Sequence, residues 1–435
     1  MNNIKISRNP FLIFLPFLAF YVAIVIIFHV DSMNLHGDEE RYYNFAQNLI
    51  HGFYSPPPPD INLTNGPGYP IILIPFVALG LSTLFIALTN AIFYYLSVVF
   101  LFKAARELSS FRIALIFALF WACYYNSYAD MIYVLTESFT CFLIAVLIFA
   151  LLKAYQYQSS SSNKSRKYVW LSGFLLGYLV LTKIIFGYVL AVLLIACIFL
   201  FLLNRKNINN KKSIFIIIIA FFFTLPYLIY TYNFTGKIFY LGSPGSDSLY
   251  WMSTPYKNEY GDWYGDLSIK PNQKDINRVP GYLDSLKLHH DQDYEKIFKY
   301  VGTEREEIFR NIAISNIKTH PVKYLENCFS NIGRLLFSYP YSYTLQNNKT
   351  LLRIPLNGII LLFSMFCLIL TFVNWQKTSF AIKFLLFFVS IYLGGTILVT
   401  AEVRMFTIIV PILLTWFAYI FDKAIKINFK FNNTD

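Results

Sequence analysis

Residues 36–70 read HGDEERYYNFAQNLIHGFYSPPPPDINLTNGPGYP and separate two strongly apolar segments, residues 11–30 and 70–102. Within this stretch apolar side chains recur three and four residues apart, at Tyr42, Phe45, Ala46, Leu49, Ile50 and Phe53. This spacing predicts an amphipathic helix with polar residues on its other face. Asp38 is a favoured residue for the N-cap and Gly52 for the C-cap. A helix of this kind lies flat in the membrane interface rather than crossing the bilayer.

The composition is that of a membrane protein. Of 435 residues, 56% are hydrophobic and only 14% are charged, which is too apolar for a soluble chain of this length. Ten apolar segments are candidate spans: residues 11–30, 70–102, 111–125, 132–152, 169–182, 184–203, 213–232, 351–373, 380–400 and 405–421. We therefore predict an all-α polytopic membrane protein with about ten transmembrane helices and interfacial helices in its outer loops.

The net charge of +12 could indicate a nucleic-acid-binding protein, but the distribution of the charges argues against that class. The ends of the chain and alternate loops are rich in lysine and arginine, and their acids are only Glu107, Asp422 and Asp435. This is the positive-inside bias of membrane proteins. It predicts that both termini are cytoplasmic and that residues 31–70 lie outside, with membrane lipid and no nucleic acid as partner.

The expected spans divide the chain into three parts. Residues 1–232 form an N-terminal membrane module of seven spans, with residues 31–70 as its first outer loop. Residues 233–350 are nearly balanced in charge and rich in Tyr, Gly, Asp and Asn, so we expect a small mixed outer domain that ends in amphipathic helices. Residues 351–435 form a C-terminal module of three spans and a basic cytoplasmic tail.

Three acidic residues are candidates for chemistry at the outer surface. Asp38 and Glu39 open the predicted interfacial helix, and Glu137 lies near the outer end of the fourth span. A carboxylate there could act as a general base, whereas the simpler interpretation of Asp38 is a helix cap, and both can hold. Asp130 is expected in a more exposed turn, and Arg41 on the solvated helix face.

Two lone cations, Lys183 and Arg404, stand where apolar segments meet the outer surface. Ionisable groups at such depths are costly and are therefore candidates for function, such as binding a phosphate group. For Arg404 the alternatives are an ion pair with Glu402 or snorkelling to head groups.

Familiar cofactor and metal motifs are absent from the sequence. It contains no GxxxxGK[ST] and no HExxH, and its five cysteines show neither a disulfide framework nor metal-ligand spacing. His289 and His290 precede Asp291 and Asp293, a pattern more typical of a solvated loop than of a metal site. We expect no cofactor; a divalent metal is possible but not indicated.

These landmarks, taken in order, resemble the GT-C superfamily, and most of all its branch of protein O-mannosyltransferases and lipid A aminoarabinose transferases. The similar stretches are GDEERYYNFAQNLIHG, NGPGYP, LTESF, GFLLGYLVLTK, THPVKYLENCFSNIGRLLF and EVRMFTIIVP. The resemblance implies that Asp38 is the acid of the first loop, with Glu39 beside it, that Glu137 is the second acid and that Arg404 is the late basic residue. Glu137 departs from the Asp of many relatives, and RMF departs from the commoner RY.

The resemblance implies a glycosyltransferase that moves a sugar from a polyprenyl-phosphate donor to an extracytoplasmic acceptor, which could be an envelope glycan, a lipid or a protein. Transfer would take place at the outer face of the plasma membrane, usually with inversion and without a metal in this branch. Asp38 would be the general base, Glu39 and Glu137 would assist, and Lys183 and Arg404 would bind the donor phosphate. The alternatives are a lipid-linked sugar transporter or flippase, a polysaccharide polymerase or ligase, and a non-catalytic envelope scaffold.

Overall fold

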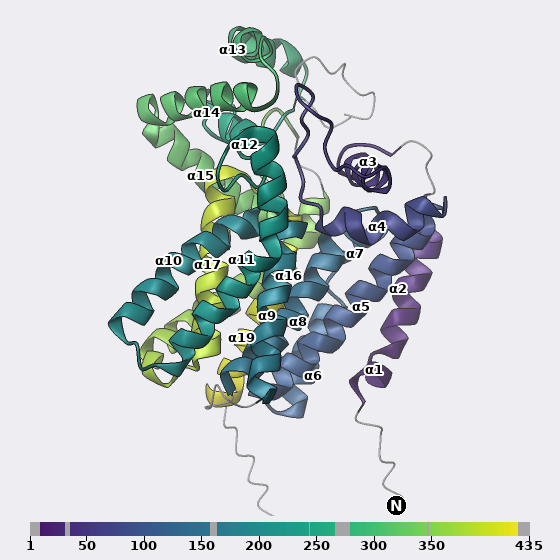
Figure 1. Cartoon of the computed structure of the whole chain (residues 1–435), viewed down its shortest axis with the longest axis vertical. Helices are drawn as coiled ribbons and strands as arrows, with labels where there is room; N and C mark the ends of the chain where they lie inside the picture. Colours follow the sequence, from purple (N-terminus) through teal and green to yellow (C-terminus); the bar gives the residue numbers. More distant parts are fainter. Residues whose placement is uncertain are drawn as a thin grey trace, which may run out of the picture.

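The computed structural model describes residues 9–30, 35–156, 163–242, 244–265, 279–345 and 348–424. Within these ranges the regular structure is helical and no strand forms, so the predicted all-α fold is confirmed. Figure 1 shows a bundle of long helices with a layer of shorter helices over one end.

The bundle is that of a multi-pass membrane protein. Six of its helices are long and apolar enough to cross a bilayer: α5 (Thr83–Leu108), α8 (Glu137–Gln156), α10 (Ile185–Leu203), α11 (Ile208–Thr235), α16 (Lys349–Val373) and α17 (Phe380–Val399). Three further apolar helices are shorter: α2 (Leu15–Phe28), α4 (Gly68–Ala78) and α6 (Phe111–Ala122). The remaining bundle elements are α1 (Pro10–Ile13), α7 (Asn126–Met131), α9 (Asn163–Thr182), α18 (Val403–Thr407), α19 (Val410–Ala424) and the short 3-10 helix Trp375–Lys377.

Three segments predicted as single spans are each broken into two helices, and the first of them, 11–30, divides into α1 and α2. The other two breaks are more pronounced in their effect on the site. The segment 70–102 divides into α4 and α5, because the left-handed backbone of Gly80 (φ 62°) reverses the chain and the Ser82 side chain caps α5. In Figure 1, α4 lies across the ends of other helices instead of running along them. The segment 405–421 divides into the short α18 and the longer α19. Both breaks lie at the end of the bundle that carries α3.

The outer layer consists of α3 (Asp38–Ile50), α12 (Pro244–Met252), α13 (Tyr282–Ile297), α14 (Gly302–Thr319) and α15 (Pro321–Phe337). Tyr42, Phe45 and Ala46 of α3 are buried, which agrees with the predicted apolar stripe. Helices α12, α13 and α14 enclose a small core of their own, formed by Tyr250, Trp251, Leu286, Tyr294, Ile297, Phe309 and Ala313.

The prediction of a solvated loop at His289 and His290 was wrong. Both residues lie in α13, where His289 Nδ1 is 2.8 Å from Glu259 Oε1 and His290 Nε2 is 3.0 Å from Glu259 Oε2. The buried Glu259 carboxylate thus binds both imidazoles and fastens α13 to the chain that follows α12. This cluster holds the outer layer together.

The end of the first outer loop packs directly on α9 through two glycines. A Cβ atom on Gly66 would lie 2.1 Å from the Leu181 carbonyl oxygen, and one on Gly68 would lie 2.7 Å from the Thr182 backbone nitrogen. Since neither backbone atom can move alone, only glycine permits this contact. The contact sets where the loop returns to the bundle.

We predict that Gly68→Ala destabilises the protein, because α4 would have to move away from α9. The matched control is Gly358→Ala in α16, since a Cβ there meets no atom within 4 Å. Thermal unfolding of the purified protein in detergent should show a clearly lower Tm for the first variant. The control should be unchanged or slightly more stable, since alanine favours a helix by about 0.5–1 kcal/mol. Equal Tm values for the two variants would contradict the proposed contact.

Candidate active site

Asp38 opens α3 but does not cap it. The N-cap position belongs to Gly37, whose φ of 63° requires a residue tolerant of left-handed backbone. Asp38, Glu39 and Glu40 fill the first turn, where negative charge is favourable. The interpretation of Asp38 as a cap was therefore wrong, and its carboxylate is free to make contacts outside the helix.

The Asp38 carboxylate binds two arginines from opposite ends of the chain. Its Oδ2 accepts a hydrogen bond of 2.5 Å from Arg404 Nη1 in α18, and its Oδ1 accepts one from Arg41 Nη2, one turn further along α3. Arg41 Nε also donates to Asn65 Oδ1 at 3.3 Å, so Arg41 connects the two ends of the first outer loop. Arg41 is thus not the purely solvated residue that its helix position predicted, although its i, i+3 spacing from Asp38 allows such a pair.

Arg404 is shared between two carboxylates. Besides Asp38, it donates from Nε to Glu402 Oε2 at 2.6 Å, the ion pair considered as an alternative from the sequence. Its Nη2 group makes no hydrogen bond to the described residues, and the side chain is 30% exposed. The guanidinium therefore keeps donors for a further anion.

Glu137 and Lys183 form a second ion pair. Lys183 Nζ lies 2.9 Å from Glu137 Oε1, and their side chains are 18% and 3% exposed. Glu137 is the first residue of α8, whereas Lys183 follows the last residue of α9. Glu137 Oε2 is buried and accepts no hydrogen bond from the described residues. A buried carboxylate oxygen without a donor is costly, so it is a ready acceptor for a polar ligand.

Glu39 does not join these two pairs through a hydrogen bond. Its Oε1 accepts from the Val134 backbone nitrogen at 2.8 Å, in the chain that leads into α8. Glu39 therefore holds α3 against the start of α8. Its side chain points in a different direction from the side chain of Asp38, which contacts Arg404.

The charges around Asp38 decide its ionisation. Burial of the carboxyl raises its pKa, but the charges of Arg404 and Arg41 outweigh burial and lower the pKa below the ordinary value. The charge of Lys183 contributes in the same direction, so the second ion pair lies within electrostatic reach of the first. Asp38 is ionised at neutral pH.

Asp130, expected to be an exposed turn residue, is a member of this group. It lies in α7, and burial together with the Glu137 carboxylate raises its pKa from 3.8 to about 8, even though Arg404 and Lys183 oppose that rise. Asp130 therefore holds a proton at neutral pH. The sequence carried no periodic signal for this position, because α7 is only six residues long.

The described residues hold no group of three or more His, Cys, Asp or Glu side chains placed to share one metal ion. The acids of the site are instead bound by arginine and lysine. Independence from metal stays a prediction.

Comparison with known proteins agrees with this architecture. Residues 65–238 match the family model described as dolichyl-phosphate-mannose-protein mannosyltransferase. The archaeal oligosaccharyltransferase AglB from Archaeoglobus fulgidus, solved with an inhibitory peptide and a dolichol-phosphate, has a similar fold. The alignment covers 98% of this chain and 53% of AglB, with 14% identity and a TM-score of 0.51. The likeness to AglB shows that the two proteins share a fold.

Two other solved structures are similar to this chain at lower scores. ArnT from Cupriavidus metallidurans bound to undecaprenyl phosphate is 12% identical, with 93% of this chain and 78% of ArnT covered and a TM-score of 0.41. The S. cerevisiae Pmt1-Pmt2 complex bound to the sugar donor is 16% identical, with 63% and 38% covered and a TM-score of 0.39. The chain spans about half the length of the oligosaccharyltransferases it matches. No curated protein matches it significantly by sequence.

We predict that Asp130 makes the stability of this protein depend on pH. Because its pKa is raised on folding, its contribution to stability is full below the ordinary value of 3.8 and is lost as the pH rises through about 8. Asp130→Asn cannot lose a proton, so its Tm in detergent should fall less than that of the wild type between about pH 6 and 9. The exposed Asp60 gives the control: Asp60→Asn should follow the wild type. If Asp130→Asn also follows the wild type, the assigned shift is wrong.

Proposed function

We propose that this protein transfers a sugar from a polyprenyl-phosphate-linked donor to an extracytoplasmic acceptor, with inversion at the anomeric carbon and with Asp38 as the general base. One observation carries the proposal: the ionised Asp38 carboxylate lies beside Arg404, within electrostatic reach of Lys183, where the interfacial helix meets the membrane bundle. A base and phosphate-binding cations in one place are what this transfer needs.

In the proposed reaction the acceptor hydroxyl oxygen forms a bond to the anomeric carbon, and the bond from that carbon to the phosphate oxygen breaks. The hydroxyl proton passes to the Asp38 carboxylate, and the polyprenyl phosphate leaves with the electron pair of the broken bond. Attack from the face opposite the leaving group inverts the anomeric carbon. No resident cofactor is needed for this exchange.

Arg404 and Lys183 would stabilise the leaving phosphate. The Nη2 group of Arg404 can donate to a phosphate oxygen without releasing Asp38, and Lys183 has further N–H donors beyond the one directed at Glu137. Charge on the phosphate increases as the bond to the sugar breaks, so these contacts strengthen in the transition state.

The other acids would assist at the sugar. The unpartnered Glu137 Oε2 could accept a hydrogen bond from a donor-sugar hydroxyl, because it is already buried and needs no further desolvation. Glu39 would keep the first turn of α3 in place through Val134.

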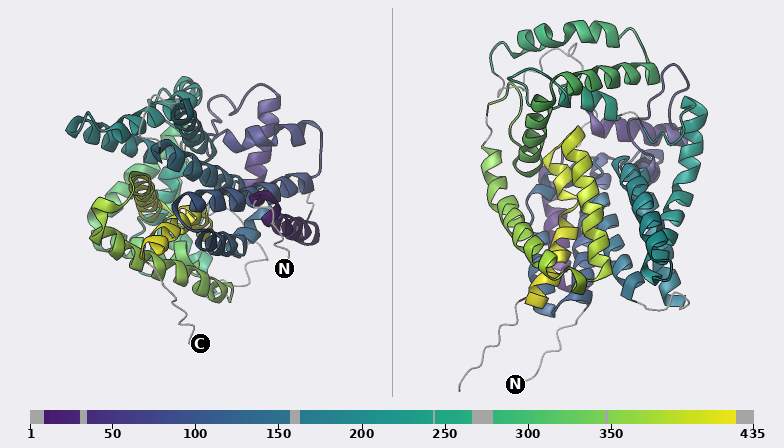
Figure 2. Two further views of the ribbon diagram at one scale, coloured as in Figure 1. Left: turned by 90° about the horizontal axis from the view of Figure 1, so that it is seen from below. Right: turned by 90° about the vertical axis from the view of Figure 1, so that its left-hand side faces the viewer.

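We also propose the arrangement in the cell. Helix α1 and the end of α19 lie on the side of the bundle opposite the outer layer, as Figures 1 and 2 show. With the positive-inside bias, this supports a plasma-membrane protein with both termini cytoplasmic and the site on the outer face. Residues 1–232 and 351–435 would be the membrane modules, and residues 233–350 the outer domain.

Asp38→Asn should abolish transfer while the protein still folds, since Gly37 and not Asp38 occupies the N-cap position. Loss of a general base lowers a rate by about 10²–10⁴-fold. The assay is turnover of a panel of polyprenyl-phosphate sugars by the purified protein in the presence of membrane extract. Asp60→Asn, in the same loop, should retain full activity. Full turnover by Asp38→Asn would remove Asp38 from the base role.

Arg404→Gln should weaken the binding of polyprenyl phosphate by about 10–100-fold, since a hydrogen bond to a charged group contributes about 1.5–3 kcal/mol. Arg404→Lys keeps the charge and should lie between this variant and the wild type. Affinity is measurable by native mass spectrometry in detergent. Arg112→Gln, an exposed arginine at the start of α6, is the control. Unchanged affinity in Arg404→Gln would contradict the phosphate role.

A further inference from the structure

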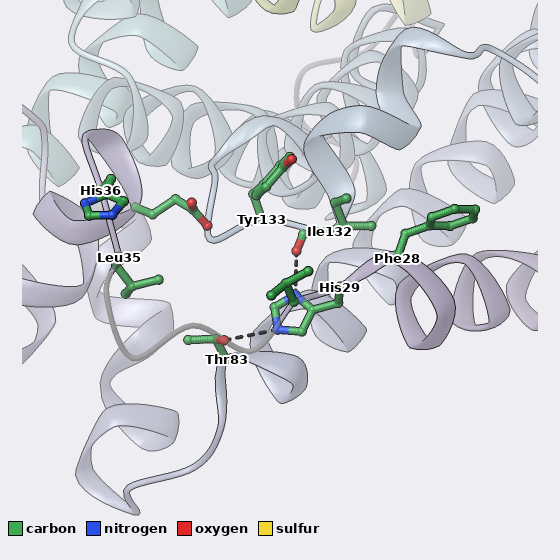
Figure 3. A pocket seen from close by; sticks show the side chains of 9 residues that line it. Phe28, His29, Leu35, His36, Thr83, Ile132 and Tyr133 are labelled. Atoms are coloured by element: carbon green, nitrogen blue, oxygen red, sulfur yellow. Dashed lines mark hydrogen bonds between the residues drawn. The ribbon is translucent and has the colours of Figure 1, made fainter. Parts of the chain in front are cut away.

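A cavity of about 200 Å³ opens between the end of α2, the start of α3 and the start of α5 (Figure 3). Its polar wall consists of His29, His36, Glu39 and Thr83, and Phe28 and Val30 are among its apolar residues. Sites for drug-sized ligands measure about 300–1,000 Å³, so this cavity has room only for a smaller group, such as one sugar ring or one head group.

His29 is held in one tautomer. Its Nδ1 lies 2.7 Å from the Ile132 carbonyl oxygen, which can only accept, so Nδ1 carries the proton. In the neutral ring Nε2 is then an acceptor, and the Thr83 hydroxyl lies 3.1 Å from it. Figure 3 shows both contacts. The fixed ring gives the cavity a preformed polar wall.

The cavity is suited to hydroxyl groups and not to phosphate. Among the described residues that line it there is no lysine or arginine, whereas the Glu39 carboxylate can accept several hydrogen bonds and uses its Oε1 for the Val134 nitrogen. An anionic phosphate beside that carboxylate would be repelled. The cations of the candidate active site are therefore beside Asp38, whereas the groups that can bind hydroxyls are in the cavity beside Glu39.

Asp38 and Glu39 place the two environments on neighbouring faces of one helical turn. Consecutive residues of a helix point about 100° apart, because a turn takes 3.6 residues. Asp38 contacts Arg404 while Glu39 lines the cavity. A group bound in the cavity would thus approach Asp38 from a side different from that of the donor phosphate.

The cavity is open toward lipid. Phe28 is 61% exposed, Val30 is 79% exposed, and Ile27 on the preceding turn is 69% exposed. Helix α2 lies at the edge of the bundle in Figure 1 and ends at the level of the outer layer. Apolar side chains at such an edge face the acyl chains of the outer leaflet.

We propose that this cavity binds the hydroxyl-bearing end of a lipid-anchored acceptor, which enters from the outer leaflet past Phe28 and Val30. The inference rests on the proposed transfer reaction and gives it an acceptor class. Glu39 accepts hydrogen bonds from the acceptor's other hydroxyls beside the wall that His29 and Thr83 form, and the reacting hydroxyl extends to Asp38.

The first test places a photo-reactive benzoylphenylalanine at Val30, or at Ile27 as the matched control, in the full-length protein in its own membrane. Mass spectrometry then identifies the adducts. We expect one hydroxyl-bearing lipid at Val30, enriched at least about fivefold over its share at Ile27, whose adducts follow the bulk lipid; fivefold corresponds to about 1 kcal/mol of preference. Bulk lipid at both positions would overturn the proposal, as would a peptide adduct at Val30.

The second test fills the cavity with Val30→Trp, with Ile26→Trp as the control on exposed surface outside it. Val30→Trp should lower the modified product in cells by about tenfold or more, equivalent to about one hydrogen-bonded contact. It should bind polyprenyl phosphate like the wild type, which also shows that it folds. Normal product from Val30→Trp would overturn the acceptor site. If the wild type binds no polyprenyl phosphate, the transfer reaction fails, and the cross-links at Val30 alone decide whether the cavity selects a lipid.

Discussion

The ion pair between Asp38 and Arg404 joins residues 366 positions apart and is the contact on which the rest of the site depends. It connects the first outer loop to the short helix that precedes the last membrane helix. Each charge also has a partner on its own segment, Arg41 for Asp38 and Glu402 for Arg404, so the pair between them adds a contact between two distant parts of the chain. The pair between Asp38 and Arg404 therefore holds α3 against α18.

The second ion pair, between Glu137 and Lys183, also joins two segments that are distant in the sequence, but it is more deeply buried than the first. Glu137 is almost fully buried and Lys183 is its cation, so the four charges of the two pairs balance as a group. Asp130 adds a carboxyl whose pKa is raised first by burial and then by the Glu137 carboxylate, so it holds a proton at neutral pH. The site is thus close to neutral without a ligand, yet keeps an unused Arg404 amino group and an unused Glu137 oxygen. Such a site can take up an anion and a hydrogen-bond donor together at little cost in rearrangement.

Much of this could be predicted from the sequence, since long apolar segments and a 3.6-residue period are local signals. The flat helix after the first span, the helical class and the five charged candidates all came from such signals. The break inside residues 405–421 did not, because hydropathy is continuous across it. Residues 70–102 are longer than one span needs, which predicts that the outer part lies in the interface or kinks at Pro75, but the break itself falls at Gly80. The pairing of Arg404 with Asp38, the raised pKa of Asp130 and the hydrogen bonds of Glu259 to two histidines depend on contacts between distant segments. Spacing along the chain contains no information on those contacts.

The close approach of Gly66 and Gly68 to Leu181 and Thr182 has a mechanical consequence for the site. Asn65, which holds Arg41, is next to the first glycine, and Lys183 is next to Thr182. Main chain rests on main chain between them, so no side-chain rotation can absorb a shift. The two ion pairs are therefore both attached to the same rigid contact between backbones. The distance between the Asp38 carboxylate and the Lys183 ammonium is set mainly by the backbone and less by side-chain rotamers.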